Sequence, residues 1–352
     1  MPEVAIASNA GSPETEFLEI EDLDQVGWND FASERGWTDG MPVIAPTADL
    51  VAQFLERCRN DDRPFRPLTP RLAVPTLTSL ATNAIMAGCK PEYFPTVVAA
   101  VRAISTPDYN LHGSLATTHP CAITLIVSGP VRHQLGVNFG TNCFGQGWRA
   151  NAAIGRAVGL IVRNIGGGVP GETDRATHGS PAKYSFCFGE NEEESPWAPY
   201  RVRRGFSAED SVVTAVSTEP PHNINDHGSK DGASILITVA SVMCQSGSNS
   251  MYNDGPTLVV FSPEHAATLH NDGWTIEAMQ KRIFDLAWIP VEKVSPGCRQ
   301  YLADNGRIIE NNAYRIAPEP ADIHIIVAGG AGRHSAWIPS YGRTDLVCEA
   351  IR

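Results

Sequence analysis

The chain contains little lysine and little charge of any kind. Only 19% of its 352 residues are charged, and five of the 27 basic residues are lysine, which leaves 22 arginines. No run approaches the ~18 apolar residues that a membrane helix requires. No block of basic residues offers a surface for a nucleic acid, and the formal net charge is −12. We therefore expect no membrane and no nucleic acid as a partner.

Two further motifs are missing. The eight cysteines include no C-x-x-C pair, which excludes zinc-finger and thioredoxin spacing. Residues 1–16 have neither a basic region nor an apolar core, so they do not read as a signal peptide. We expect these residues to form a flexible N-terminal lead, and we expect free thiols in a protein of the cytoplasm.

Apolar residues, glycine and proline are abundant, at 42% hydrophobic residues with 31 Gly and 26 Pro. The apolar run at 122–130 is typical of a strand buried on both faces. The segment 149–165 is typical of a helix, and glycines end it. Further strands are expected at 183–190, 211–217, 257–262 and 322–330. Strands that alternate with helices predict an α/β fold, with one or more mixed or mostly parallel sheets flanked by helices.

We expect glycine-rich loops at the strand ends of this fold. The chain divides weakly into a first half at 17–195 and a second half at 196–352, or forms one compact unit. Three strands end in similar turns followed by His133, His265 and His334. Because open α/β sheets bind ligands beyond the carboxyl ends of their strands, these endings could converge on one site.

The segment TTHPCAITLIV places His119 and Cys121 just before a strand. Residues i and i+2 share a face only in extended chain, where a thiol and an imidazole could form a catalytic pair. The alternative is a cysteine packed in the core. On this basis His119 is a candidate nucleophile or acid–base group.

Carboxylates crowd the segment GENEEE after the strand at 183–190. Neighbouring carboxylates raise one another's pKa, which suits general acid–base catalysis. Glu190, nearest the strand, is the preferred candidate base and Glu192 the alternate. The competing interpretation is a solvated acidic loop.

Two glycine-rich segments could bind an anion. The first, 136–147, leads into a helix that starts with Arg149 and Asn151, where backbone N–H groups and the helix dipole favour negative charge. The second has the sequence AGGAGRHS and resembles a nest of N–H donors. Its candidate binding residues are Gly329, Gly330, Arg333 and His334. Neither segment has a nucleotide-binding motif, so we expect a carboxylate or oxyanion ligand, or purely structural turns.

The segment PPHNINDHG brings His222, Asp226 and His227 within six residues. Imidazole and carboxylate groups suit a divalent metal, although the pattern is not H-E-x-x-H. These residues form either part of a metal site or a polar turn. A divalent metal is the one cofactor we consider, and no organic cofactor is predicted.

Several motifs together resemble a bacterial family of uncharacterised proteins, often described as thioredoxin-like or UGSC-type (seleno)proteins. They are RGWTDGMPVIAPT, NAIMAGCKPEYFP, ATTHP, IVSGP, GQGWRANAAIGRA, GENEEESPW and SPEHAATL. The resemblance covers nearly the whole chain and implies a bacterial cytoplasmic enzyme. The chain lacks the family's Cys-Gly-Ser-Cys tetrapeptide. Cys89 lies in the most family-like motif and is the preferred catalytic thiol.

Together these features predict an enzyme of lyase or hydrolase type that acts on a small anionic molecule. Catalysis would be of the acid–base kind, assisted by a cysteine. The alternatives are a metal-dependent hydrolase or hydratase that uses His222, Asp226 and His227, and a thiol redox or small-molecule-binding protein. Gly155 and Gly159 would let the helix that carries them pack closely inside the subunit or across the interface of a homo-oligomer.

Overall fold

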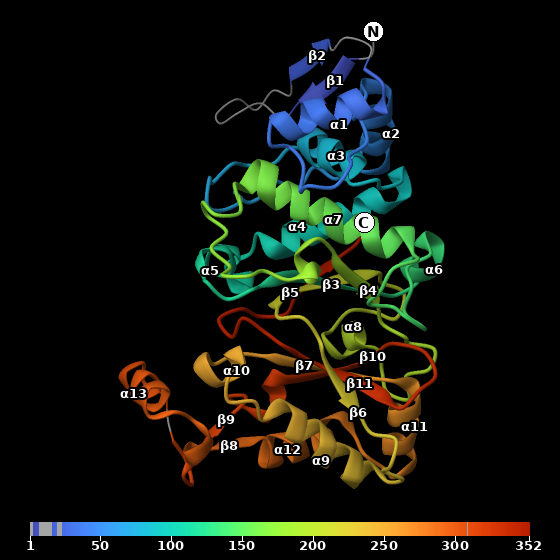
Figure 1. The fold of residues 1–352 in the computed structure, drawn as a ribbon. Helices are drawn as coiled ribbons and strands as arrows, with labels where there is room; N and C mark the ends of the chain where they lie inside the picture. Colours follow the sequence, from blue (N-terminus) through green and yellow to red (C-terminus); the bar gives the residue numbers. More distant parts are fainter. Residues whose placement is uncertain (1–2, 7–15, 20–22, 308) are drawn as a thin grey trace.

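The computed structural model describes residues 3–6, 16–19, 23–307 and 309–352. Two four-stranded mixed sheets lie face to face, and helices cover the outer face of each (Figure 1). This arrangement confirms the α/β fold with mixed sheets flanked by helices.

The first sheet has the strand order β12-β5-β3-β4, in which β3 and β4 are parallel and the other neighbours antiparallel. Its strands are β3 (Ala122–Ser128), β4 (Phe186–Gly189), β5 (Val212–Thr218) and β12 (Val347–Ala350). The second sheet has the order β10-β7-β11-β6, with β10 and β7 parallel. Its strands are β6 (His222–Asn225), β7 (Thr257–Phe261), β10 (Ile323–Val327) and β11 (His334–Pro339).

The two sheets repeat one pattern and exchange their last strands. Each has a parallel pair followed by two antiparallel strands. β6 follows β5 along the chain but joins the second sheet, while β12 follows β11 and joins the first. The crossovers, residues 219–221 and 340–346, run between the sheets. The division at 195/196 therefore crosses the first sheet, whose strands β3 and β4 precede it and whose strands β5 and β12 follow it.

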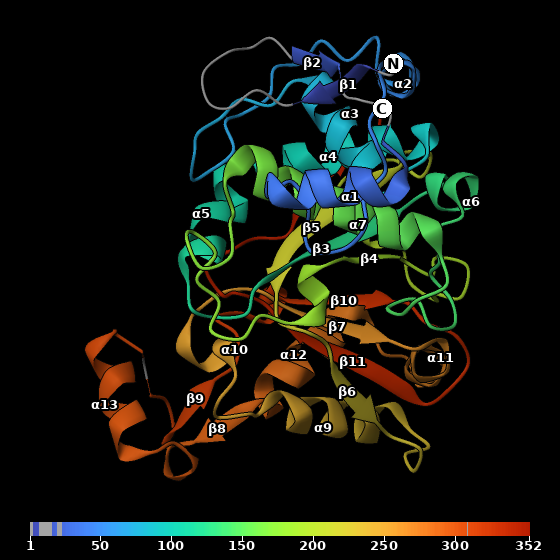
Figure 2. The ribbon, with the colours of Figure 1, turned by 45° about the horizontal axis from the view of Figure 1, so that its top comes forward.

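Helices close the first sheet on its outer side. α4 (Phe94–Ile104) and α7 (Arg149–Ile161) pack on it, and α1 (Gln25–Glu34), α2 (Ala48–Arg57) and α3 (Leu77–Met86) lie further out (Figure 2). Arg156 of α7 and Arg163, just after it, hold the segment between α1 and α2. Arg156 donates to both carboxylate oxygens of Asp39 at 2.8 Å, and Arg163 donates to Gly36 O.

The second sheet is covered by α9 (Gly232–Met243), α11 (Pro263–Asn271) and α12 (Ile276–Leu286). A third apolar cluster fills the space between the sheets, with Phe188 and Val216 facing Val260 and Ile338. Burial on both faces explains why the strands read as unbroken apolar runs rather than as an alternation of apolar and polar residues.

Shorter elements complete the molecule. The helices are α5 (Leu111–Ala116), α6 (Val131–Leu135), α8 (Tyr200–Arg203), α10 (Asn249–Tyr252) and α13 (Pro296–Asp304), and β8 (Trp288–Pro290) pairs with β9 (Ala313–Arg315). Within the lead expected to be flexible, β1 (Glu3–Ile6) pairs with β2 (Glu16–Glu19). Residues 1–2 and 7–15 lie outside the described residues. No helix in the described part of the chain has the length and apolar character to cross a membrane.

Candidate functional site

The site with the clearest chemical organisation lies where the start of β3 meets the end of β5. These strands are antiparallel, and Ala122 pairs with Thr218. His119 and Cys121, just before β3, are therefore brought beside Glu219, just after β5. Glu219 also opens the crossover from β5 to β6, and its N–H donates to Pro339 O at the end of β11. The strand exchange thus builds the surroundings of this site.

A thiol, an imidazole and a carboxylate form a continuous chain here. His119 Nδ1 lies 2.8 Å from Cys121 Sγ, and His119 Nε2 lies 2.6 Å from Glu219 Oε1. A tight turn, in which Cys121 N–H donates to His119 O at 2.9 Å, folds the ring back toward the thiol. We call Cys121, His119 and Glu219 the relay. The order of groups is that of a nucleophile, its base and the carboxylate that orients the base.

The carboxylate of the relay is held from several sides. Glu219 also accepts from Asn249 N–H at 3.2 Å and lies 3.5 Å from His222 Nε2. Burial alone would raise the pKa of Glu219, but hydrogen bonds from His119 and His222 outweigh it and lower the pKa to about 2. Glu219 is therefore ionised at neutral pH and can accept a hydrogen bond from His119 Nε2–H.

This lowered pKa predicts an acid-sensitive fold. A carboxyl group whose pKa falls from about 4.5 to about 2 on folding stabilises the protein above pH ~5 and loses that contribution as the pH falls toward 2. The contribution is about 3 kcal/mol. Urea unfolding from pH 7 to pH 2.5 should show that Glu219→Gln costs stability at pH 7 and progressively less on acidification. A cost that is independent of pH would contradict this assignment.

The thiol of the relay is buried among polar groups. Burial raises the pKa of the Cys121 thiol to about 12, and the neighbouring Ser217 hydroxyl partly offsets this effect. Ser217 shares a face with Cys121, because it pairs with Ile123 two residues along β3. The hydroxyls of Ser217 and Tyr109 are both buried without a well-formed hydrogen bond. The Ser217 hydroxyl lies close to both the Cys121 thiol and the Tyr109 hydroxyl, so two hydroxyl donors stand beside the thiol.

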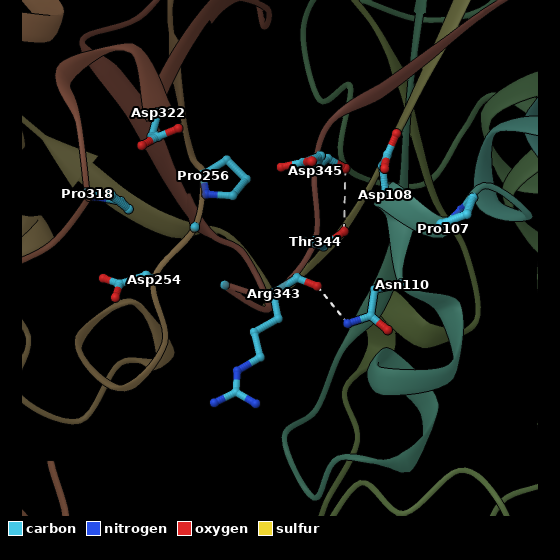
Figure 3. A pocket seen from close by; sticks show the side chains of 12 residues that line it. Pro107, Asp108, Asn110, Asp254, Pro256, Pro318, Asp322, Arg343, Thr344 and Asp345 are labelled. Carbon is cyan, nitrogen blue, oxygen red and sulfur yellow. Dashed lines mark hydrogen bonds between the residues drawn. The ribbon is translucent and has the colours of Figure 1, made fainter. Parts of the chain in front are cut away.

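A cleft of about 370 Å³ is lined by residues 107–108, 110, 254–256 and 342–345, among others (Figure 3). Tyr109 is flanked by Asp108 and Asn110, which line the cleft, and Thr344 Oγ1 donates to Tyr109 O at 2.8 Å. The ring of Tyr341, 6.4 Å from that of His119 between centroids, precedes the cleft residue Gly342. None of the relay residues lines the cleft, but Tyr109 and Tyr341 are next in sequence to residues that do.

Cys89 is not brought to this site. Its thiol lies in the helical core and donates to Ala153 O of α7 at 3.3 Å, and burial raises its pKa strongly. All eight cysteines of the chain are free thiols. The thiol that His119 contacts is Cys121.

The two predicted bases lie at the opposite end of β3 from the relay. Glu190 accepts from Tyr200 N–H at 2.8 Å and from Ser128 Oγ at 2.9 Å, and burial raises its pKa. Glu192 forms ion pairs with Arg132 and Arg201 at 3.3 and 3.0 Å. Both carboxylates are engaged in holding the loop after β4, and the structure does not gather them with His119.

Protein groups already use most of the donors expected to bind an anion. Arg149 Nε donates to Gly88 O at 2.9 Å. The Asn151 side chain accepts from the N–H of Asn138 and donates to its C=O. In the second loop Gly329 N–H donates to Phe139 O. Arg333 donates to two carbonyls of the 226–229 turn. Gly330 is packed against Thr141, where a Cβ would meet the threonine hydroxyl. These contacts favour the structural interpretation of both loops.

The proposed metal ligands are separated by the geometry of a strand. His222 starts β6 and contacts Glu219, whereas Asp226 follows β6, and four extended residues span roughly 13 Å. The Asp226 carboxylate accepts from Ser229 N–H and Thr238 Oγ1 at 2.8 and 2.7 Å. Within the described ranges no three His, Cys, Asp or Glu side chains are grouped to hold a metal. His227 instead meets His334, with 3.1 Å between their Nε2 atoms.

Sequence reasoning missed Glu219, Tyr109 and Ser217. Glu219 is 100 residues from His119 and shows no local motif, so only the β3–β5 pairing reveals it. In comparisons with known proteins, no family model matches the chain and a search of curated proteins finds no significant match.

Proposed function

We propose that the protein is an enzyme that hydrolyses or transfers the acyl group of a small molecule, with Cys121 as its nucleophile. The observation that carries the proposal is the unbroken contact from thiol to imidazole to carboxylate, at 2.8 and 2.6 Å. Cysteine nucleophiles are recognised by this arrangement of roles rather than by sequence position.

The proton path follows from the charges. The Cys121 thiol is neutral at pH 7, because burial raises its pKa to about 12. The ionised Glu219 accepts the Nε2–H of His119, which leaves the Nδ1 lone pair facing Sγ. As Sγ attacks the acyl carbon, His119 Nδ1 takes the thiol proton and later delivers it to the leaving group. Water then attacks the thioester by the same path, or an acceptor nucleophile takes the acyl group.

The hydroxyls of Tyr109 and Ser217, which lie beside the thiol, are suited to the oxygen of the acyl group. That oxygen becomes an anion during attack, and donors already fixed around it stabilise the transition state. Tyr109→Phe should slow acylation of Cys121 by about 100-fold, the effect of removing one oxyanion donor. Alkylation of Cys121 by iodoacetamide forms no oxyanion and should change little. Equal slowing of both reactions would show that Tyr109 only shapes the site.

We place the rest of the substrate in the cleft, and the charges on the cleft wall then indicate the charge of that part. Its wall carries Asp108, Asp254, Asp322 and Asp345 against one arginine, Arg343 (Figure 3). Asp254 pairs with Arg307, which does not line the cleft. This balance favours a neutral or cationic substrate over the anionic one expected from the glycine-rich loops.

The proposal is tested by trapping the acyl-enzyme. The native protein is mixed with p-nitrophenyl acetate, quenched in acid and digested for peptide mass spectrometry. We expect acetylation at Cys121 within the first turnover, and none at the equally buried Cys89. Acetylation that appears on exposed side chains but never on Cys121 would refute the assignment.

A further inference from the structure

Two exposed histidines face each other at the edge of the second sheet. His334 starts β11 and pairs with Asn225 of β6. Because side chains alternate along β6, Asn223 and Asn225 fall on the same side of the sheet as His334, and His227 lies in the bend that follows β6. The result is a contact of 3.1 Å between His227 Nε2 and His334 Nε2, with the rings at 77°.

Asn223 fixes the orientation of the His334 ring. His334 Nδ1 lies 3.0 Å from Asn223 Oδ1. The amide oxygen can only accept, so Nδ1 carries the proton and Nε2, which lies near His227 Nε2, carries the lone pair. Histidines that bind metals almost always donate their other N–H to an oxygen in this way.

We propose that His227 and His334 form a binding site for a divalent transition metal, with Asn223 as the group that orients His334. Two cis imidazole ligands of a tetrahedral or tetragonal ion, each about 2.0–2.1 Å from it, hold their nitrogens roughly 3 Å apart. Both side chains are exposed, so water fills the remaining positions. Imidazole suits Ni²⁺, Cu²⁺ and Zn²⁺ rather than Mg²⁺ or Ca²⁺. The site is independent of the relay and of the proposed acyl chemistry.

Nickel is a suitable probe, because it binds imidazole and its paramagnetism reports which rings it approaches. Calorimetry with Ni²⁺ should show one site in the native protein. His227→Ala and His334→Ala should each weaken it at least tenfold, and Asn223→Ala by about tenfold, the usual effect of losing an orienting partner. His270→Ala, which removes another surface histidine, is the matched control and should leave the affinity unchanged.

Nitrogen-15 spectra of the histidine rings give a second readout that does not depend on affinity. Sub-stoichiometric Ni²⁺ should broaden the signals of His227 and His334 before those of the other histidines. The proposal is overturned if the native protein binds no Ni²⁺, if His227→Ala and His334→Ala bind it like the native protein, or if other rings broaden first.

Discussion

Replacing Cys121 with alanine should abolish acyl transfer to the protein, with a fall of at least ~10³-fold in the burst rate with p-nitrophenyl acetate. The change removes one buried sulfur atom, so the protein should stay folded. His119→Ala should cost about 10²–10⁴-fold, because it removes the base that contacts the thiol. Cys89→Ala is the matched control, since Cys89 is as buried as Cys121 and has no imidazole partner.

The three relay residues should act as one unit. The loss in the variant that combines Cys121→Ala with His119→Ala should equal that of Cys121→Ala alone, because a base without a nucleophile does nothing. Glu219→Gln should have a smaller effect than either single change, since the amide can still contact the ring but cannot stabilise the imidazolium charge. Losses that multiply across the relay, or full activity in Cys121→Ala, would contradict the proposed mechanism.

Replacing Arg132 with methionine should destabilise the fold by about 3–5 kcal/mol, the cost of removing one partner from a buried ion pair. Arg132 is only 2% exposed, and it pairs with the largely buried Glu192 at 3.3 Å. Its guanidinium donates to both oxygens of the half-exposed Glu193, at 2.9 and 3.0 Å. It also donates to the carbonyls of Gly129 and Glu190, which ties the end of β3 to the loop after β4. Methionine fills the volume but leaves these acceptors without their donor, and Glu192 keeps only Arg201 of its two arginine partners.

Urea unfolding at pH 7 measures this cost. His133→Ala is the matched control, because His133 contacts the same Glu193 from the exposed side at 2.8 Å. An exposed pair of this kind contributes about 0–1 kcal/mol. If Arg132→Met cost no more than His133→Ala, the buried carboxylates of the 190–194 loop would not depend on Arg132 in the way described.

The local features of the fold could be predicted from the sequence, and the partners of its strands could not. The apolar run at 122–130 and the glycine-ended helix at 149–165 correspond to β3 and α7. The residues of PPHNIND favour a metal site or a polar turn, whereas the segment contains strand β6. Its polar residues fit an edge strand with one exposed face. That it pairs with β11 rather than with β5 depends on the whole topology, which no local pattern encodes.

The same limit applies to the site. His119 and Cys121 are two residues apart, so their contact could be anticipated from extended geometry. Glu219, which completes the relay, is placed by a strand pairing. The crowded carboxylates predict a base at Glu190, but burial is the larger cause of its raised pKa. The neighbouring Glu192 is neutralised by Arg132, 60 residues earlier in the chain, and by Arg201. Cys89 was selected from a motif, and its thiol packs against α7.

Competitive labelling of all eight thiols tests whether Cys121 and His119 act as nucleophile and base. The native protein is exposed to a trace of iodoacetamide at pH 7, and the modification rate of each cysteine is measured by peptide mass spectrometry. Among the buried cysteines, Cys121 should react much faster than Cys89, Cys143 and Cys187, and His119→Ala should remove that advantage. Modification of Cys121 at the rate of Cys89, or a fast rate that persists without His119, would contradict the claim that these residues act as nucleophile and base.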